Sequence, residues 1–185
     1  MNLILERYSP RAFNPNKQIS NENLLKILKA GQWAQSSFNN QPWRFFVASK
    51  SINPNLFEEI YNTFIDFNKL WAKNASVYIV LTCLKEYEHN NKPNNTSLFE
   101  LGLATQNMVL QALSLNIHSH IISGFDKEQL SKILNLNDKI ECVAVLILGY
   151  LDSIDILPEE IKKAEIEKIR TRKNLEEIVF YEPLK

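Results

Sequence analysis

The feature that most constrains this chain is an almost unbroken apolar run at positions 77–84, VYIVLTCL. So short a run is typical of a β-strand whose two faces are both covered by other elements. Helix and strand patterns alternate along the rest of the chain. Further strands are predicted at 44–49, 117–123 and 142–150. Helices are predicted at 21–34 behind a Ser20 cap, from 56 to about 72, at 97–115, and at 126–134, where the start is capped.

The length, the net charge and the lengths of the apolar runs limit the class of protein to which this chain can belong. A chain of 185 residues fits one domain, or one domain with an arm. Its 21 basic and 21 acidic side chains cancel, whereas a nucleic-acid binder usually carries a basic excess. The longest apolar runs are too short to cross a bilayer, and residues 1–10 lack the apolar core of a signal peptide. We therefore expect a cytoplasmic protein that binds neither membrane nor nucleic acid.

Cysteine and histidine do not form a metal-binding pattern. Cys83 and Cys142 stand singly inside apolar runs, which favours reduced core residues. His118 and His120 would share one face of a strand, but no further ligand stands at a supporting spacing. No metal site is expected.

The last 35 residues differ in character from residues 1–150. Positions 152–173 are charged, and positions 178–181, IVFY, are apolar again. An apolar strand at the end of a polar arm needs a surface on which to dock. Two interpretations remain open: the arm docks on its own domain, or it is exchanged across a dimer.

The usual nucleotide-binding motifs are missing. The four glycines form neither GxGxxG nor GxxxxGK[ST], and the chain contains no GxSxG or HExxH motif. If this protein binds a phosphorylated cofactor, side chains must do what glycine-rich loops do elsewhere.

The N-terminal segment offers such side chains. Arg7, Ser9 and Arg11 lie two apart, and in an extended chain they point the same way. Two guanidinium groups flanking a hydroxyl suit a phosphate or a polar ribityl chain. Taken alone, the three residues are explained slightly better as a solvated basic segment. Arg170 and Arg172 repeat the pattern near the other end, with the same two interpretations.

Two connecting segments complete the candidate site. Residues 35–43, QSSFNNQPW, carry hydroxyls and amides in numbers that a simple turn does not need, which favours a binding loop. At 123–126, SGFD, a strand meets a helix, and Gly124 allows close approach of a ligand. A plain helix cap by Asp126 explains this second segment equally well.

Together these segments resemble the short, single-domain members of the nitroreductase family. The resemblance rests on ERYSPRAF, AQSSFNNQPWRFFV, FELGLATQNMVLQALSLNIHSHIISGFD, ILGYL and RTRKNLEEIV, in that order and over nearly the whole chain. It implies an α+β fold with a central mixed sheet, a domain-swapped homodimer with FMN at its interface, and reduction by NAD(P)H. Residues 1–150 would form the core, and residues 151–185 an arm that completes the flavin site and crosses to the partner.

The resemblance also implies roles for individual residues. Arg7, Ser9 and Arg11 would hold the FMN phosphate, ribityl chain and pyrimidine edge, with Arg11 stabilising the charge of the reduced flavin. The other implied cofactor-binding residues are Ser36, Ser37, Asn39 and Gln41 in the loop, Ser123 and Gly124 near the reactive nitrogen, and Arg170 and Arg172 at the phosphate. Gln35 replaces the proline usual in this loop, which puts the contact of the loop with the ring in doubt. Glu100 and Gly102 are interpreted as helix packing.

The implied activity is a two-step reduction of a flat acceptor, such as a nitroaromatic or quinone, at the expense of NAD(P)H. An enal or a halogenated aromatic is an alternative substrate. A flavin-binding or regulatory protein without efficient turnover is an alternative from another class. The acceptor, the choice between NADH and NADPH, the use of oxygen, and the roles of His118, His120 and Tyr87 stay open.

Overall fold

The centre of the fold is a four-stranded sheet. The computed structural model describes residues 3–167 and 170–183. The strands β1 (Trp43–Ser49), β2 (Val77–Leu84), β3 (His118–Ile122) and β4 (Ile140–Gly149) lie in the order β1-β2-β4-β3. All three neighbouring pairs are antiparallel. The α+β class is therefore confirmed, but the expected mixed sheet is wrong for the strands that the structure describes.

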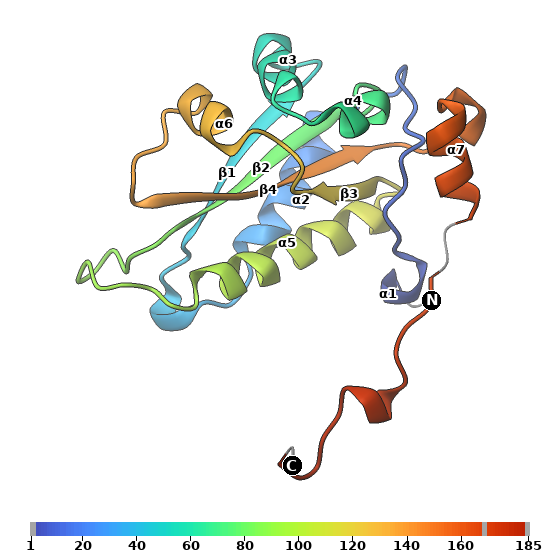
Figure 1. Cartoon of the computed structure of the whole chain (residues 1–185). Helices are drawn as coiled ribbons and strands as arrows, with labels where there is room; N and C mark the ends of the chain where they lie inside the picture. The colour runs from blue at the N-terminus through green and yellow to red at the C-terminus, as the bar shows by residue number, and fades with distance from the viewer. Residues whose placement is uncertain (1–2, 168–169, 184–185) are drawn as a thin grey trace.

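Helices cover both faces of the sheet, which explains the apolar run in β2 (Figure 1). On one face lie α2 (Asn21–Gln32) and α5 (Ser97–Ser114), and on the other lie α3 (Pro54–Asn62), α4 (Asp66–Ala72) and α6 (Lys127–Ile133). Tyr78 and Val80 of β2 join the core beneath α3 and α4. Ile79 and Leu81 join the core beneath α2 and α5. Because successive side chains point to opposite faces, each position of β2 meets a buried layer.

Both predicted helix caps are present. The Ser20 hydroxyl accepts a hydrogen bond from the backbone N–H of Asn23 at 3.2 Å, at the start of α2. The Asp126 carboxylate accepts one from the N–H of Gln129 at 2.9 Å, at the start of α6. Each cap satisfies a backbone donor that the first helical turn leaves without a partner.

The single helix predicted from 56 to about 72 is wrong, because it is broken between α3 and α4. The carbonyl of Thr63 accepts a hydrogen bond from the N–H of Asp126 at 2.7 Å, and the N–H of Ile65 donates to the carbonyl of Gly124 at 3.1 Å. Backbone groups that would continue the helix instead hold the segment between β3 and α6. No local pattern predicts this break, because the hydrogen-bond partners lie more than fifty residues away in the sequence.

The end of the chain also differs from the expectation. After β4 come the short turn η2 (Ile154–Ile156), the helix α7 (Glu159–Ile166) and the turn η3 (Leu175–Glu177). From the turn η3 onward, the described chain extends away from the body of the domain (Figure 1). The apolar run at 178–181 forms no strand and is exposed, with Tyr181 97% exposed. Docking of this run on its own domain is therefore wrong, and residues 168–169 and 184–185 of the predicted arm lie outside the described residues.

Candidate functional site

The N-terminal segment is held along the edge strand β3. It follows the short helix α1 (Leu3–Glu6) and has no regular structure from residue 7 to residue 12. The Arg7 guanidinium donates a hydrogen bond from Nη1 to Oγ of Ser9 at 3.3 Å, so these two side chains meet, as predicted. Nδ1 of His120 in β3 lies 2.9 Å from the carbonyl oxygen of Pro10, and the Tyr8 ring contacts the His118 ring edge-on at 5.8 Å between centroids. Both histidines therefore help to place the segment.

Arg170, near the other end of the chain, reaches this segment. Its Nη2 donates hydrogen bonds to the carbonyl oxygens of Leu5 at 2.6 Å and Arg7 at 2.7 Å. Its guanidinium also lies over the Tyr8 ring, 5.9 Å from the centroid. The two ends of the chain thus meet at one place.

Three guanidinium groups gather where the ends meet. Burial lowers the pKa of Arg7, and the positive charges of Arg170 and Arg172 lower it further. Among the described residues, none of the three forms an ion pair with an aspartate or glutamate. Arginine keeps its charge under all ordinary conditions, so a bound anion would relieve this repulsion. This cluster has the charge and the donors to bind a phosphate.

Arg11 does not join the cluster. Its Nη1 pairs with Oε2 of Glu165 in α7 at 3.2 Å, and the two side chains are only 19% and 7% exposed. The ring of Phe67 in α4 lies 5.6 Å from the guanidinium carbon. Nε of Arg11 is buried and has no hydrogen-bond partner among the described residues. Arg11 therefore keeps one unused donor beside an internal counter-ion, and no sequence pattern singled out Glu165 within the charged arm.

Ser123 and Gly124 lie beside α4, the helix that also carries Phe67. The carbonyl of Gly124 accepts hydrogen bonds from the N–H of Ile65 and from Nδ2 of Asn68, at 3.1 and 3.0 Å. A Cβ at position 124 would lie 2.7 Å from Cδ1 of Ile65. Gly124 therefore lies close against the side chains of Ile65 and Asn68, while the Ser123 side chain is exposed.

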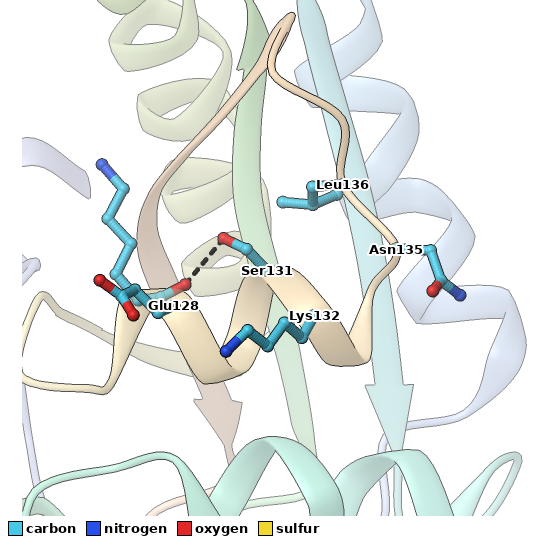
Figure 2. A pocket seen from close by; sticks show the side chains of 6 residues that line it. Glu128, Ser131, Lys132, Asn135 and Leu136 are labelled. Carbon is cyan, nitrogen blue, oxygen red and sulfur yellow. Dashed lines mark hydrogen bonds between the residues drawn. The ribbon is translucent and has the colours of Figure 1, made fainter.

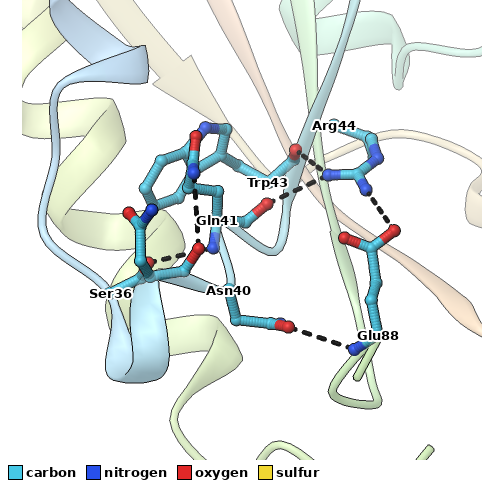
Figure 3. A network of polar contacts seen from close by, with 7 residues as sticks. Ser36, Asn40, Gln41, Trp43, Arg44 and Glu88 are labelled. Atoms are coloured by element: carbon cyan, nitrogen blue, oxygen red, sulfur yellow. Dashed lines mark hydrogen bonds and ion pairs between the residues drawn. The ribbon is translucent and has the colours of Figure 1, made fainter. Parts of the chain in front are cut away.

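The loop of residues 36–41, the amide loop below, has an unusual backbone, and Figure 3 shows the polar contacts of Ser36, Asn40 and Gln41 within and around it. It contains the turn η1 (Ser37–Asn39). Phe38, Asn39 and Gln41 have positive φ angles of 53°, 53° and 46°, which residues other than glycine seldom adopt. The N–H of Gln41 donates to Oγ of Ser36 at 2.9 Å, which closes the loop. Asn40 ties it to the next loop, because its Oδ1 accepts a hydrogen bond from the N–H of Glu88 at 3.0 Å.

An exposed aromatic cluster stands on the amide loop. Phe38 is 81% exposed, and its ring lies 5.9 Å from that of Tyr87 and 5.6 Å from that of His89. The Tyr87 hydroxyl lies 3.5 Å from Oγ of Ser37. Exposed rings of this kind offer flat surfaces for stacking.

The amide loop and the arginine cluster lie at opposite ends of α5 (Figure 1). The loop is attached to the first turn of α5, where the carboxylate of Glu100 accepts a hydrogen bond from the N–H of Ser37 at 2.8 Å. Leu3, next to the arginine cluster, lies beside Asn107 and Ser114 in the second half of the helix. Eighteen helical residues span about 27 Å. One chain therefore brings Arg7, Ser9, Arg170 and Arg172 together but leaves Ser36, Ser37, Asn39 and Gln41 apart from them.

The predicted site residues do not line the hollow along α6, which is a separate feature of the surface. A hollow of about 990 Å³ runs along α6 and is lined by Lys127, Glu128, Ser131, Lys132, Asn135 and Leu136 (Figure 2). Within the described part of the chain, no three His, Cys, Asp or Glu side chains are placed to hold a metal ion. Cys83 and Cys142 are free and buried, and burial raises the pKa of Cys142 to about 11. Among the described helices, none is long and apolar enough to cross a membrane.

Comparison with known proteins gives an independent assignment of the fold and the family. The model of the nitroreductase family matches residues 4–150. A solved structure described as an oxidoreductase containing FMN superposes with a TM-score of 0.90 at 31% identity, over 99% of this chain and 91% of that one. A nitroreductase family protein of Clostridium difficile 630 superposes with a TM-score of 0.73 at 25% identity, over 100% of both chains. The major NAD(P)H-flavin oxidoreductase of Aliivibrio fischeri is 24% identical over 215 residues, and the match covers 94% of each chain.

These matches extend over the sheet, the helices of both layers and the N-terminal arginine segment. The order of motifs in the sequence and the order of elements in the structure lead to the same assignment. This chain belongs to the nitroreductase family.

Proposed function

We propose that this protein is an FMN-dependent oxidoreductase that takes hydride from NAD(P)H and reduces a flat acceptor such as a nitroaromatic or a quinone. The observation that carries the proposal is the meeting of Arg7, Arg170 and Arg172 from opposite ends of the chain, without a carboxylate partner among the described residues. A dianionic phosphate fits this charge. The FMN in the similar solved structure and the flavin chemistry of the Aliivibrio fischeri relative support the choice of cofactor.

Different residues in and around the cluster would bind different parts of FMN. Arg7, Arg170 and Arg172 would bind the phosphate, and the Ser9 hydroxyl beside Arg7 would bind the ribityl chain. Each charge-assisted hydrogen bond of this kind contributes about 1.5–3 kcal/mol. The cluster would thus bind FMN without a glycine-rich loop.

Arg11 and the segment at 123–124 would face the flavin ring. The buried Nε of Arg11 is a donor without a partner among the described residues, which fits an acceptor on the pyrimidine edge. FMN, when bound, supplies the hydride-transfer chemistry, and the protein supplies placement and electrostatics. Glu165 holds the Arg11 guanidinium in place and offsets part of its charge. Arg11 would then orient the ring edge and stabilise negative charge there.

A second copy of the chain would complete the site. The amide loop is separated from the arginines by the length of α5, so Ser36, Ser37, Asn39 and Gln41 would reach the flavin of the partner. The exposed run at 178–181 supplies the arm that crosses. The edge strand β1 would be the place where the partner's arm docks. A hollow of about 670 Å³ lies beside it, lined by residues of α2 and β1 that include Leu25, Leu28 and Phe45.

Spectroscopy tests the proposal directly. The purified protein, or the protein titrated with FMN, should show the visible absorption bands of bound flavin. Anaerobic NADH or NADPH should bleach those bands, and a quinone or nitroaromatic should restore them. Bands that resist bleaching would identify a flavin-binding protein without turnover. A colourless protein that ignores added FMN would reject the proposed function altogether.

A further inference from the structure

We infer that Glu100 is a positioning residue for the amide loop, acting through the backbone N–H of Ser37. Glu100 stands in the first turn of α5 and is only 3% exposed. Its Oε1 accepts the hydrogen bond from Ser37 at 2.8 Å. The inference rests on the proposed function, in which this loop contacts the flavin of the partner.

Each oxygen of the carboxylate accepts a hydrogen bond from a neutral donor. Oε1 also accepts a hydrogen bond from Oγ1 of Thr96 at 2.8 Å, and Oε2 accepts one from Nδ2 of Asn94 at 3.2 Å. Oδ1 of Asn94 accepts one from the N–H of Thr96 at 3.0 Å, which fixes the orientation of the amide. A buried carboxylate without a cation is costly unless hydrogen bonds satisfy it. Glu100 meets that condition by joining three segments: α5, residues 94–96 and the amide loop.

The amide loop needs such an anchor. Phe38, Asn39 and Gln41 occupy left-handed backbone conformations, which persist only where the surroundings hold them. The Ser36–Gln41 bond closes the loop on itself, and Asn40 holds its far side. Glu100 holds the near side, immediately before the first left-handed residue. Without the Ser37 bond the loop can relax, and its amides and hydroxyls lose their fixed directions.

The variant Glu100→Gln tests this with little change in volume. The new amide group must point an N–H toward one of the existing donors, Ser37, Thr96 or Asn94. We expect FMN to bind at least 10-fold more weakly and the visible circular dichroism of bound FMN to change. The matched control is Glu128→Gln, an exposed glutamate in the first turn of α6, which should leave both unchanged.

A second variant removes the same hydrogen bond from the donor side, with Ser37→Ala as the control for the loss of the hydroxyl. Ser37→Pro removes the N–H while leaving the Glu100 carboxylate with Thr96 and Asn94. It should weaken the binding of FMN to a similar extent. The losses of Glu100→Gln and Ser37→Pro should not add in the double variant, because both loosen the same anchor of the amide loop. If Glu100→Gln does not fold, Ser37→Pro decides the question.

The outcomes separate this inference from the proposed function. A wild-type protein that does not bind FMN refutes the function. A wild type that binds FMN, with either folded variant binding it equally well and with the same dichroism, overturns the role of Glu100 alone. Additive losses in the double variant also contradict it.

Discussion

At the scale of single residues, the arginine cluster lowers the stability of the fold and raises its affinity for an anion. Arg7 is held near Arg170 and Arg172, and their mutual repulsion lowers its pKa in the structure. Like charges that are kept together without a counter-ion destabilise the protein and strengthen the binding of an anion. The cluster therefore has the properties of a binding site more than those of a structural contact.

Arg7→Ala should separate these two effects. FMN affinity is expected to fall about 10- to 100-fold, because about 1.5–3 kcal/mol of charge-assisted bonding is lost. The melting temperature of the FMN-free protein should stay the same or rise, because repulsion is relieved. Fluorescence titration and thermal unfolding measure the two quantities, with Lys132→Ala on α6 as the control. A fall in stability with unchanged affinity would show that Arg7 is structural.

His118 gives the fold a dependence on pH. Burial lowers its pKa from the ordinary value of 6.5. Above pH 6.5, the His118 imidazole is neutral in both the folded and the unfolded chain. As the pH falls through 6.5, the unfolded chain takes up a proton first. The free energy of unfolding therefore falls. His118→Gln should flatten the dependence of the melting temperature on pH below about 6.5. If the melting temperatures of the wild type and the variant depend on pH in the same way in this range, His118 is not the cause of the dependence.

At the scale of elements, the N-terminal segment is positioned by the end of β4. The N–H of Asn14 donates to the carbonyl of Tyr150 at 2.8 Å, and Phe13 forms a bridge with Leu151. Phe13 is fully buried and lies against Gly149, where an added Cβ would be 2.7 Å from Cδ1 of the ring. This contact places Arg11 two residues upstream.

Gly149→Ala should therefore destabilise the protein by about 1–3 kcal/mol through overpacking. It should also weaken the binding of FMN, because the N-terminal segment shifts. Gly102→Ala is the matched control, since its added methyl meets no atom within 4 Å, and it should stabilise α5 by up to about 1 kcal/mol. Urea unfolding of both variants checks the prediction, and equal stabilities would count against it.

At the scale of the whole molecule, one chain holds only part of the proposed site. The arginines and the amide loop are separated by α5, and the last described residues extend from the body with their apolar side chains exposed. A second copy would bring the two parts together and cover the arm.

Removing residues 174–185 should weaken this assembly. We expect sedimentation to shift toward the monomer and FMN to be retained less, because the amide loop no longer reaches the partner. A full-length variant with serine at positions 178–181 controls for the length of the arm and should behave like the deletion. Unchanged dimers in both proteins would show that the arm is not part of the interface.

The elements that the sequence predicted correctly are those with a local cause. The strand at 77–84 follows from its apolar run, and the starts of α2 and α6 follow from Ser20 and Asp126. The break between α3 and α4 could not be predicted, because its hydrogen bonds go to residues 124 and 126. The same holds for Glu165 and Glu100, whose charges alone do not reveal their partners.

By itself, the sequence determined the alternation of helices and strands, the family resemblance and the residue types of the candidate site, because these depend on neighbours along the chain. Only the tertiary structure decided which of those residues meet. Arg170 reaches the carbonyl of Arg7 across 163 positions, Arg11 reaches Glu165 across 154, and Ser37 reaches Glu100 across 63. Such contacts depend on the path of the whole chain around the sheet, which no local pattern contains.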